Sequence, residues 1–469
     1  MQGLGSVSMS VGAPVERGPG DADAAGHAPR ASNGDVERHS LVAILELVRT
    51  GRAATRLDLE RASSLGRAIV ADRLATLARL GLVEPGAPGP SMGGRAPRTV
   101  RFRTDAGLLL VASIDRSTIG VGLADLAGRI VFEHHEAIGL AAGPDPVIGR
   151  LTTLLDWVLD QRERTRDLWG IGIGVPGPVE APPKGAFAPQ RLTFAPSWSE
   201  SLAVERLIAR HRAPVWVRSA FQMAAMGELG VPRPGRPHSL MYVDLGTEIS
   251  AGLISGGRLH SGAQGIAGQI GHVYAGEDDP IVCRCGNAGC LETVAGSDAV
   301  VRAATEAARA GRSRRLADML AANGAIGVAD IGAAAQLGDA AAAQVLSRCG
   351  RLIGVALAAL TNAFNPASVV LGGELAQTGD IVLAAIREAI YRHAHPLATR
   401  DLRIVRSDMG RSAGLAGAAL VAVDELFAPD LLGEWIGLGS PLRHPEMAAL
   451  LARADAAVRQ REPPAQTPA

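Results

Sequence analysis

The chain has 469 residues, more than one ordinary domain needs, so we expect two or three domains. Acidic and basic residues balance at 47 each, and the overall charge therefore favours no class of partner. No apolar run reaches the roughly 20 residues that span a bilayer, and the amino terminus has no basic start followed by an apolar stretch. These features exclude a signal peptide and predict a cytoplasmic protein without a membrane partner.

Residues 1–34 are rich in Gly, Ala, Pro and Ser. Such a segment cannot bury enough apolar surface to offset its chain entropy, so we expect a disordered extension. Residues 35–103 differ in charge, because twelve Arg face seven acidic residues. This compact basic unit is the candidate for a domain that binds an acidic partner such as nucleic acid.

Apolar residues recur at helical spacing over about 36–50 and again over about 65–80. Between them, Thr55-Arg-Leu-Asp58 has the form of a capping box that opens a short helix ending near Ala62. Two short helices, a tight turn and a longer helix are typical of a helix-turn-helix.

Two short strands, predicted at 82–83 and 99–102, flank a loop rich in Gly and Pro, which is typical of a wing. Arginines in such a unit can neutralise DNA phosphates or enter a minor groove. The candidate DNA contacts are Arg67 and Arg73 on the third helix and Arg95 and Arg98 in the wing. The alternatives are a protein-binding domain or a remnant, in which these arginines are ordinary solvated side chains.

Residues 104–427 combine apolar strands, Gly-rich turns and Ala-rich helices, as in a large α/β domain. Within it, Cys283-x-Cys285-x4-Cys290 places three cysteines on one short loop, and His272 lies eleven residues earlier. Three Cys and one His close a tetrahedral structural zinc site without an open position for catalysis. The alternative is three cysteines that pack as small buried hydrophobic side chains.

Several segments, in this order, resemble the ROK family (repressor, open reading frame, kinase). They are ARLGLVEPGAPGPSMGGRAPR, Gly172-Ile-Gly-Val-Pro-Gly-Pro178, Ala267-Gly-Gln-Ile-Gly-His272, the CxCGxxGCLE signature at Cys283–Glu292, Phe364-Asn-Pro366 and Leu371-Gly-Gly373. The resemblance spans roughly residues 38–427. It implies an α/β chain in which a winged helix-turn-helix precedes a two-lobed actin-like ATPase fold of the ROK sugar-kinase type. Members are sugar kinases or, with a winged helix in front, sugar-responsive transcription factors.

Three segments depart from the pattern of the family's kinases. The glycine pair of the first phosphate loop falls on Asp115 and Arg116, and a glycine of the second falls on Glu248, where a carboxylate repels phosphate. The family's catalytic Asp falls on Ala220, which cannot accept a proton. We therefore expect no phosphotransferase activity, no catalytic residue and no bound ATP. The alternative is a sugar kinase with an accessory DNA-binding-like domain.

The family's sugar-contacting positions are kept in part. The resemblance places them on Gly177, Ser219, Gln269, His272 and Glu292. Ser219 replaces an Asn and Gln269 replaces a carboxylate, although a Gln amide still hydrogen-bonds hydroxyls. We expect a sugar or sugar-phosphate effector; another small molecule, no effector, or control by a protein partner are the alternatives.

The sequence as a whole favours a sequence-specific regulator of double-stranded DNA, with repression as the favoured mode. We expect a homodimer or tetramer, since two winged helices would then read two half-sites. Residues 428–469 are expected to form a tail with one helix near 445–458.

Overall fold

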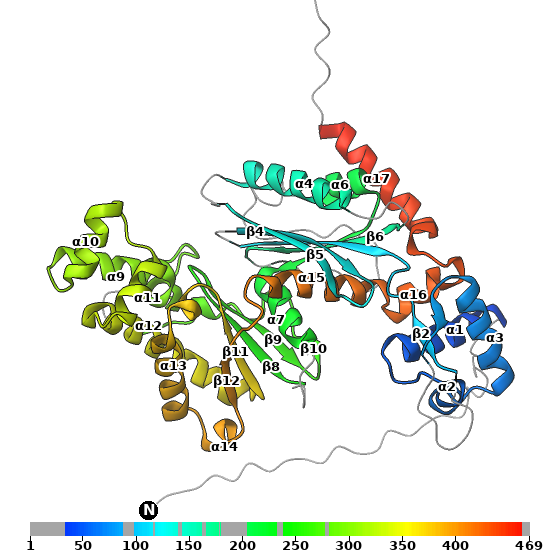
Figure 1. Ribbon diagram of the computed structural model, residues 1–469, viewed down its shortest axis with the longest axis horizontal. Coiled ribbons are helices and arrows are strands. Elements are labelled where there is room, and N and C mark those ends of the chain that lie inside the picture. Colours follow the sequence, from blue (N-terminus) through cyan, green and yellow to red (C-terminus); the bar gives the residue numbers. More distant parts are fainter. Residues whose placement is uncertain are drawn as a thin grey trace, which may run out of the picture.

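The computed structural model describes residues 33–87, 98–115, 118–138, 143–161, 166–177, 179, 204–231, 238–276 and 281–461. Figure 1 shows a small, mainly helical unit beside two α/β lobes. The predicted extension, apart from its last two residues, and most of the predicted wing loop, including Arg95, lie outside the described residues.

The small unit, residues 33–87 and 98–102, is called the winged unit below. It consists of α1 (Asn33–Arg49), α2 (Arg56–Ser63), α3 (Arg67–Arg79) and the antiparallel strands β1 (Val83–Pro85) and β2 (Val100–Phe102). The predicted capping box is confirmed, because the Thr55 hydroxyl accepts the N–H of Asp58 while the Asp58 carboxylate accepts the N–H of Thr55, both at 3.2 Å. The predicted helices, turn and strand pair are therefore present.

The first lobe, or N-lobe, is built on a five-stranded sheet in the order β5-β4-β3-β6-β7. Its strands are β3 (Leu108–Ile114), β4 (Thr118–Asp125), β5 (Ile130–Ala137), β6 (Leu168–Val175) and β7 (Val215–Ser219). Every residue of β4 and β6 is buried, which indicates that helices cover both faces of the sheet. In Figure 1, α4 (Pro144–Asp160) and α6 (Val204–His211) lie on one face, and α7 (Ala220–Gly230) and α15 (Ser412–Leu426) lie on the other.

The second lobe, or C-lobe, has a sheet in the order β10-β9-β8-β11-β12. Its strands are β8 (Leu240–Leu245), β9 (Ile249–Ser255), β10 (Arg258–Leu259), β11 (Ser368–Gly372) and β12 (Arg403–Arg406). Its helices are α8 (Leu291–Ala295), α9 (Ser297–Arg309), α10 (Arg314–Asn323), α11 (Val328–Gln336), α12 (Ala340–Phe364), α13 (Asp380–His393) and α14 (Pro396–Thr399). The two lobes confirm the expected α/β architecture of the kinase type.

Among the described residues, α12 is the one helix with the length and apolar composition of a membrane span. It packs against α13, and two glycines make the approach close: a Cβ at Gly350 would lie 2.8 Å from the Cβ of Ala385, and one at Gly354 would lie 2.6 Å from that of Ala389. Buried side chains of α12 also belong to the core of the C-lobe. The packing therefore accounts for the apolar character of α12.

The tail contains more helix than the sequence predicted, since α16 (Pro429–Trp435) precedes α17 (Pro445–Arg461). Helix α16 packs against α1 of the winged unit, and α17 packs against α6 of the N-lobe. One hydrophobic core runs from the winged unit through α16 into the N-lobe. The tail thus fixes the winged unit to the body of the protein.

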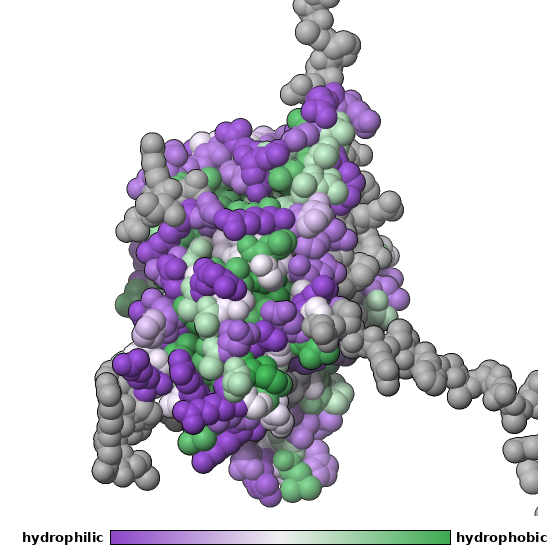
Figure 2. All heavy atoms as spheres, turned by 90° about the vertical axis from the view of Figure 1, so that its right-hand side faces the viewer, coloured by the Kyte–Doolittle hydropathy of each residue, from purple (hydrophilic) through white to green (hydrophobic). Residues whose placement is uncertain are grey.

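Aromatic side chains concentrate at this junction. The ring centroids of Phe102 and Phe427 lie 5.4 Å apart, those of Phe427 and Trp435 lie 5.5 Å apart, and those of Trp169 and Trp435 also lie 5.5 Å apart. The guanidinium of Arg49 lies 5.0 Å from the centre of the Phe427 ring. We call these five residues the seam. Figure 2 views this side of the molecule, where hydrophilic side chains are interspersed with smaller hydrophobic areas.

Candidate metal centre and effector site

The cysteine signature forms a tight loop between the sheet and α8. The N–H of Cys283 donates to the carbonyl of Asn287 at 2.7 Å, and the N–H of Gly286 donates to the carbonyl of Cys283 at 2.9 Å. Gly286 and Gly289 have φ of 91° and 72°, a left-handed conformation that favours glycine. These turns bring the three cysteines of the loop to one side.

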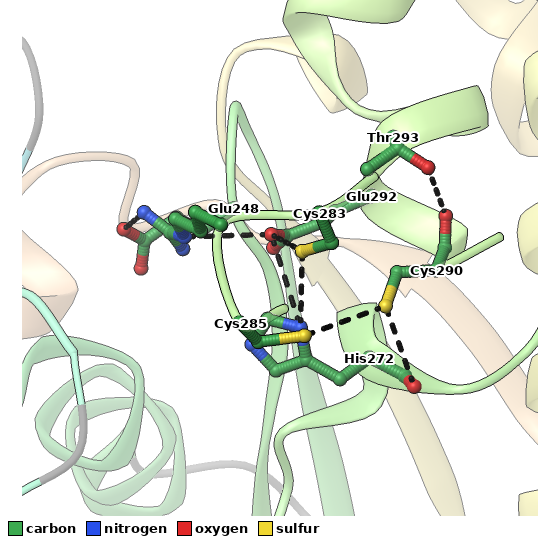
Figure 3. Close-up of polar contacts among 8 residues, drawn as sticks. Glu248, His272, Cys283, Cys285, Cys290, Glu292 and Thr293 are labelled. Carbon is green, nitrogen blue, oxygen red and sulfur yellow. Dashed lines mark hydrogen bonds and ion pairs between the residues drawn. The ribbon is translucent and has the colours of Figure 1, made fainter. Parts of the chain in front are cut away.

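His272, Cys283, Cys285 and Cys290 converge as the sequence predicted (Figure 3). Their ligand atoms all lie within 4.8 Å of one another; Cys283 Sγ is 3.6 Å from His272 Nδ1, and Cys285 Sγ is 3.7 Å from Cys290 Sγ. Tetrahedral zinc with Zn–S bonds of about 2.3 Å separates its sulfur ligands by roughly 3.8 Å. The arrangement therefore fits a tetrahedral divalent metal ion.

Two further features bear on this cluster. Cys285 is exposed, so packing as a small buried side chain does not account for all three cysteines. Burial raises the pKa of the Cys283 thiol to about 12, and metal binding requires the thiolate. At Cys285, by contrast, a backbone hydrogen bond from Asn287 lowers the pKa of the thiol.

Arg284, which lies between Cys283 and Cys285 in the sequence, connects the loop to two carboxylates. Its Nη1 donates to Glu248 Oε1 at 2.5 Å, and its Nε lies 3.4 Å from Glu292 Oε1. The same Glu292 oxygen accepts the thiol of Cys283 at 3.1 Å. The sequence analysis missed Arg284, because its partner Glu248 lies 36 residues earlier and no local pattern relates them.

Two expected effector residues, Gly177 and Ser219, lie at one edge of the N-lobe sheet. Strands β6 and β7 are parallel neighbours with Val175 opposite Ser219, and Gly177 follows two residues later with φ of 84°. Ser219 is fully buried, and its hydroxyl has no hydrogen-bond partner among the described residues. A buried hydroxyl without a partner is rare and indicates a place for a ligand or a water molecule.

Gln222 is a second residue that the sequence analysis missed. Its Nε2 donates to the carbonyl of Gly265 at 3.0 Å, whereas its Oε1 is buried without a partner in the described part of the chain. Gly265 lies in the segment that leads to the half-buried Gln269 and then to His272. Gln222 thus joins the edge that holds Ser219 to the segment that reaches the metal cluster and Glu292.

A cavity of about 750 Å³ is lined by residues of both lobes. Asp115 and Ala220 line it. The Asp115 carboxylate accepts the N–H and the hydroxyl of Thr118, each at 2.6 Å. A carboxylate therefore already holds a backbone N–H of the first loop.

The candidate DNA contacts differ in their surroundings. Arg67 and Arg98 are exposed. Arg73 is not directed outward: its side chain is only 15% exposed, its Nε donates to Ser40 Oγ at 2.7 Å, and its Nη1 donates to Glu37 Oε1 at 3.2 Å. Arg73 therefore ties α3 to α1, and this geometry does not favour it as a DNA contact.

Comparison with known proteins places this fold in a family. The ROK family model matches residues 117–425. The chain belongs to the ROK family. A putative xylose repressor of Caldicellulosiruptor is 27% identical over 84% of this chain and 98% of its own, and the Escherichia coli DNA-binding transcriptional dual regulator NagC is 26% identical over 82% and 93%.

Two solved structures sharpen this comparison. A ROK family transcriptional regulator, a homologue of the E. coli MLC protein, superimposes with a TM-score of 0.69 over 86% of this chain and 99% of its own, at 24% identity. A ROK glucokinase from Streptomyces griseus, in complex with glucose and AMPPNP, reaches 0.57 over 67% and 99%, at 28% identity. The relatives named as a putative xylose repressor and as NagC match 84% and 82% of this chain, more than the 67% that the glucokinase matches, which supports a ROK transcriptional regulator.

Proposed function

We propose that this protein is a sequence-specific DNA-binding transcriptional regulator, acting as a repressor, whose kinase-like body has lost phosphotransfer. The observation that carries the proposal is the winged unit in front of the ROK body, in a chain that matches a putative xylose repressor over 84% of its length. Exposed Arg67 and Arg98, with Arg95 of the wing, are the proposed DNA contacts.

The loss of phosphotransfer is proposed from the cleft. Phosphoryl transfer needs amides that hold phosphate and a base that orients the attacking hydroxyl. Ala220 supplies no base, and Asp115 occupies an N–H that a phosphate could use. A sugar kinase is the second candidate, because a ROK glucokinase matches 67% of the chain.

Structural zinc is proposed at His272, Cys283, Cys285 and Cys290, where it would close the loop and hold Arg284 toward Glu292. The proposed effector is a sugar or sugar phosphate bound by Gly177, Ser219, Gln269, His272 and Glu292, with Gln222 added from the structure. The two unpartnered oxygens on Ser219 and Gln222 support a ligand rich in hydroxyl groups. A homodimer would present two winged units to two half-sites.

The test is fluorescence anisotropy of the full-length protein on DNA that tiles its own upstream region, with excess random competitor at two salt concentrations. We expect one fragment to bind above competitor, and binding to weaken as salt rises. Arg67→Ala should weaken binding and reduce the salt slope by about one, whereas Arg314→Ala, at an exposed position of α10, should change neither. Absence of specific binding together with hexose-dependent ATP turnover would favour the kinase.

A further inference from the structure

One aliphatic side chain of α3 lies outside the core of the winged unit. The core takes Val70, Leu74 and Leu77 from this helix, and all three are buried. Ile69, the third residue of α3, belongs to the same apolar pattern in the sequence, yet 43% of it is exposed. A single exposed isoleucine is common on protein surfaces, so what it can do depends on its surroundings.

The residues beside Ile69 on the exposed side of α3 are mostly small. Ala68, Asp72 and Ala75 recur at intervals of four and three residues and are all exposed, so they share the side of the helix opposite the core. Ile69 lies next to this row, three positions before Asp72. A helix with its side chains is about 10–12 Å across, so small residues help it to enter a major groove that is about 12 Å wide.

Exposed arginines lie on α3 and on the helix before it. Arg67 and Arg79 are the first and last residues of α3, and α2 adds Arg56 and Arg61. In a helix-turn-helix, the first helix crosses the DNA backbone while the amino-terminal residues of the second contact base edges. The two helices therefore offer positive charge to phosphates, and the first turn of α3, with Ile69, has the position of the base contacts.

Asp72 indicates which part of a duplex this side of α3 meets. It is the one acidic residue of α3, and its carboxylate accepts Arg73 Nη1 at 2.5 Å. A carboxylate is repelled by phosphate but can accept the amino group of cytosine in the major groove. An aspartate in the exposed row therefore favours base edges over the phosphate backbone as the surface in contact with this side of α3.

The chemistry of isoleucine selects one group of the major groove. Base edges present hydrogen-bond donors and acceptors there, and an aliphatic side chain that covers such a group removes its water without replacing the bond. The methyl group of thymine is the apolar exception, and contact with it releases water from both partners. We propose that Ile69 contacts a thymine methyl group in the major groove and so selects thymine at one position of each half-site. This inference rests on the proposed function, because it requires α3 to enter DNA.

The test uses the shortest duplex that the full-length protein binds with full affinity in the anisotropy assay. Each thymine is replaced, one at a time, by deoxyuridine, which keeps the base pair and removes only the methyl group. We expect affinity to fall about fourfold at one thymine of each half-site, the factor that corresponds to one buried carbon group. The salt dependence should stay the same, because no phosphate contact is lost.

Variants assign the effect to the side chain. Ile69→Ala should bind the thymine duplex and the sensitive deoxyuridine duplex equally, each at least about fourfold more weakly than the parent protein binds the thymine duplex. Val36→Ala, at a valine of α1 that is 58% exposed, is the matched control and should keep the parent's preference for thymine. Ile69→Val, which removes only the terminal methyl group of the side chain, should keep part of that preference.

Three outcomes would overturn the inference while specific DNA binding persists: no deoxyuridine weakens binding, Ile69→Ala shows the same loss on deoxyuridine as the parent, or Ile69→Ala binds as tightly as the parent. The second would show that thymine acts through the shape or stiffness of the duplex. The third would show that Ile69 does not contact DNA. Absence of specific binding to any fragment would instead reject the proposed function, and this inference with it.

Discussion

The cluster of candidate metal ligands and the seam differ in how far apart in the chain their residues lie. The four candidate ligands of the loop fall between His272 and Cys290, and glycine turns bring them together locally. The seam joins Arg49 and Phe102 to Phe427 and Trp435, more than 300 residues later. The first is a chemical motif within one segment, and the second exists only when the whole body has folded.

The two regions should therefore respond differently to substitution. Removal of a candidate metal ligand should act first on the loop and its contacts to Glu292 and Arg284, because the surrounding core of the C-lobe has its own hydrophobic residues. Removal of a seam residue should act on the attachment of the winged unit to the body, because one core is continuous across that junction. The following substitutions test the distinction, from the largest expected effect to the smallest.

Cys283→Ser should have the largest effect, on metal content. Loss of one of four ligands opens the tetrahedral site, and structural zinc contributes on the order of 10 kcal/mol where it organises a small fold. We expect bound metal to fall from about one ion per chain to nearly none, measured by elemental analysis after dialysis. Cys349→Ala, at a buried cysteine on α12 outside the cluster, should keep the metal. Full metal retention in Cys283→Ser would contradict the proposed ligand set.

Trp435→Ala should lower the free energy of unfolding by about 3–5 kcal/mol, since this side chain is fully buried between Phe427 and Trp169. In the parent protein, calorimetry should show one unfolding transition for the winged unit and the N-lobe together. In the variant, the winged unit should unfold in a separate transition at a lower temperature. Trp157→Ala, at a position of α4 that is 41% exposed, is the matched control and should cost less. If Trp435→Ala and Trp157→Ala lowered the free energy of unfolding equally, the seam would not be what holds the winged unit.

The sequence predicted best what depends on neighbours in the chain. The capping box at Thr55 and Asp58 and the convergence of the four metal-ligand candidates follow from spacing, turn-forming glycines and side-chain chemistry. The two-lobed fold was accessible through the family resemblance, since its motifs are spread over the body in a fixed order. Most of the architecture could therefore be predicted from short-range geometry and from the fixed order of the family's motifs.

The sequence could not predict contacts between distant segments. Arg284 meets Glu248 across 36 residues, and Gln222 meets Gly265 across 43, so no periodicity relates either pair. The tail was expected to hold one helix, whereas α16 packs against α1 and completes the seam. A sequence does not distinguish an exposed arginine from one that ties two helices together. It therefore predicts a DNA contact at Arg73 as readily as at Arg67.

Arg73→Ala distinguishes these two arginines. Because Arg73 is mostly buried and donates to Ser40 and Glu37, its loss should lower the free energy of unfolding by about 1–2 kcal/mol. Arg67→Ala should leave stability within about 0.5 kcal/mol and weaken DNA binding instead. Urea unfolding and anisotropy on the same preparations measure both quantities. A stable Arg73→Ala protein with weakened DNA binding would return Arg73 to the DNA contacts.

Arg49→Met should have the smallest effect, of about 1 kcal/mol on the free energy of unfolding. The substitution removes the contact between the guanidinium and the Phe427 ring, which is worth about 0.5–2 kcal/mol where water is partly excluded. Methionine keeps the apolar contacts that the methylene groups of the Arg49 side chain make. Burial lowers the pKa of Arg49, and its Nε has no partner among the described residues, so relief of this desolvation offsets part of the loss. Arg38→Met, at an exposed position of α1, should be nearly silent in the same urea titration. If both variants lost the same stability, the effect would belong to α1 itself. A loss confined to Arg49→Met would show that even a contact of low energy helps the body to hold the winged unit.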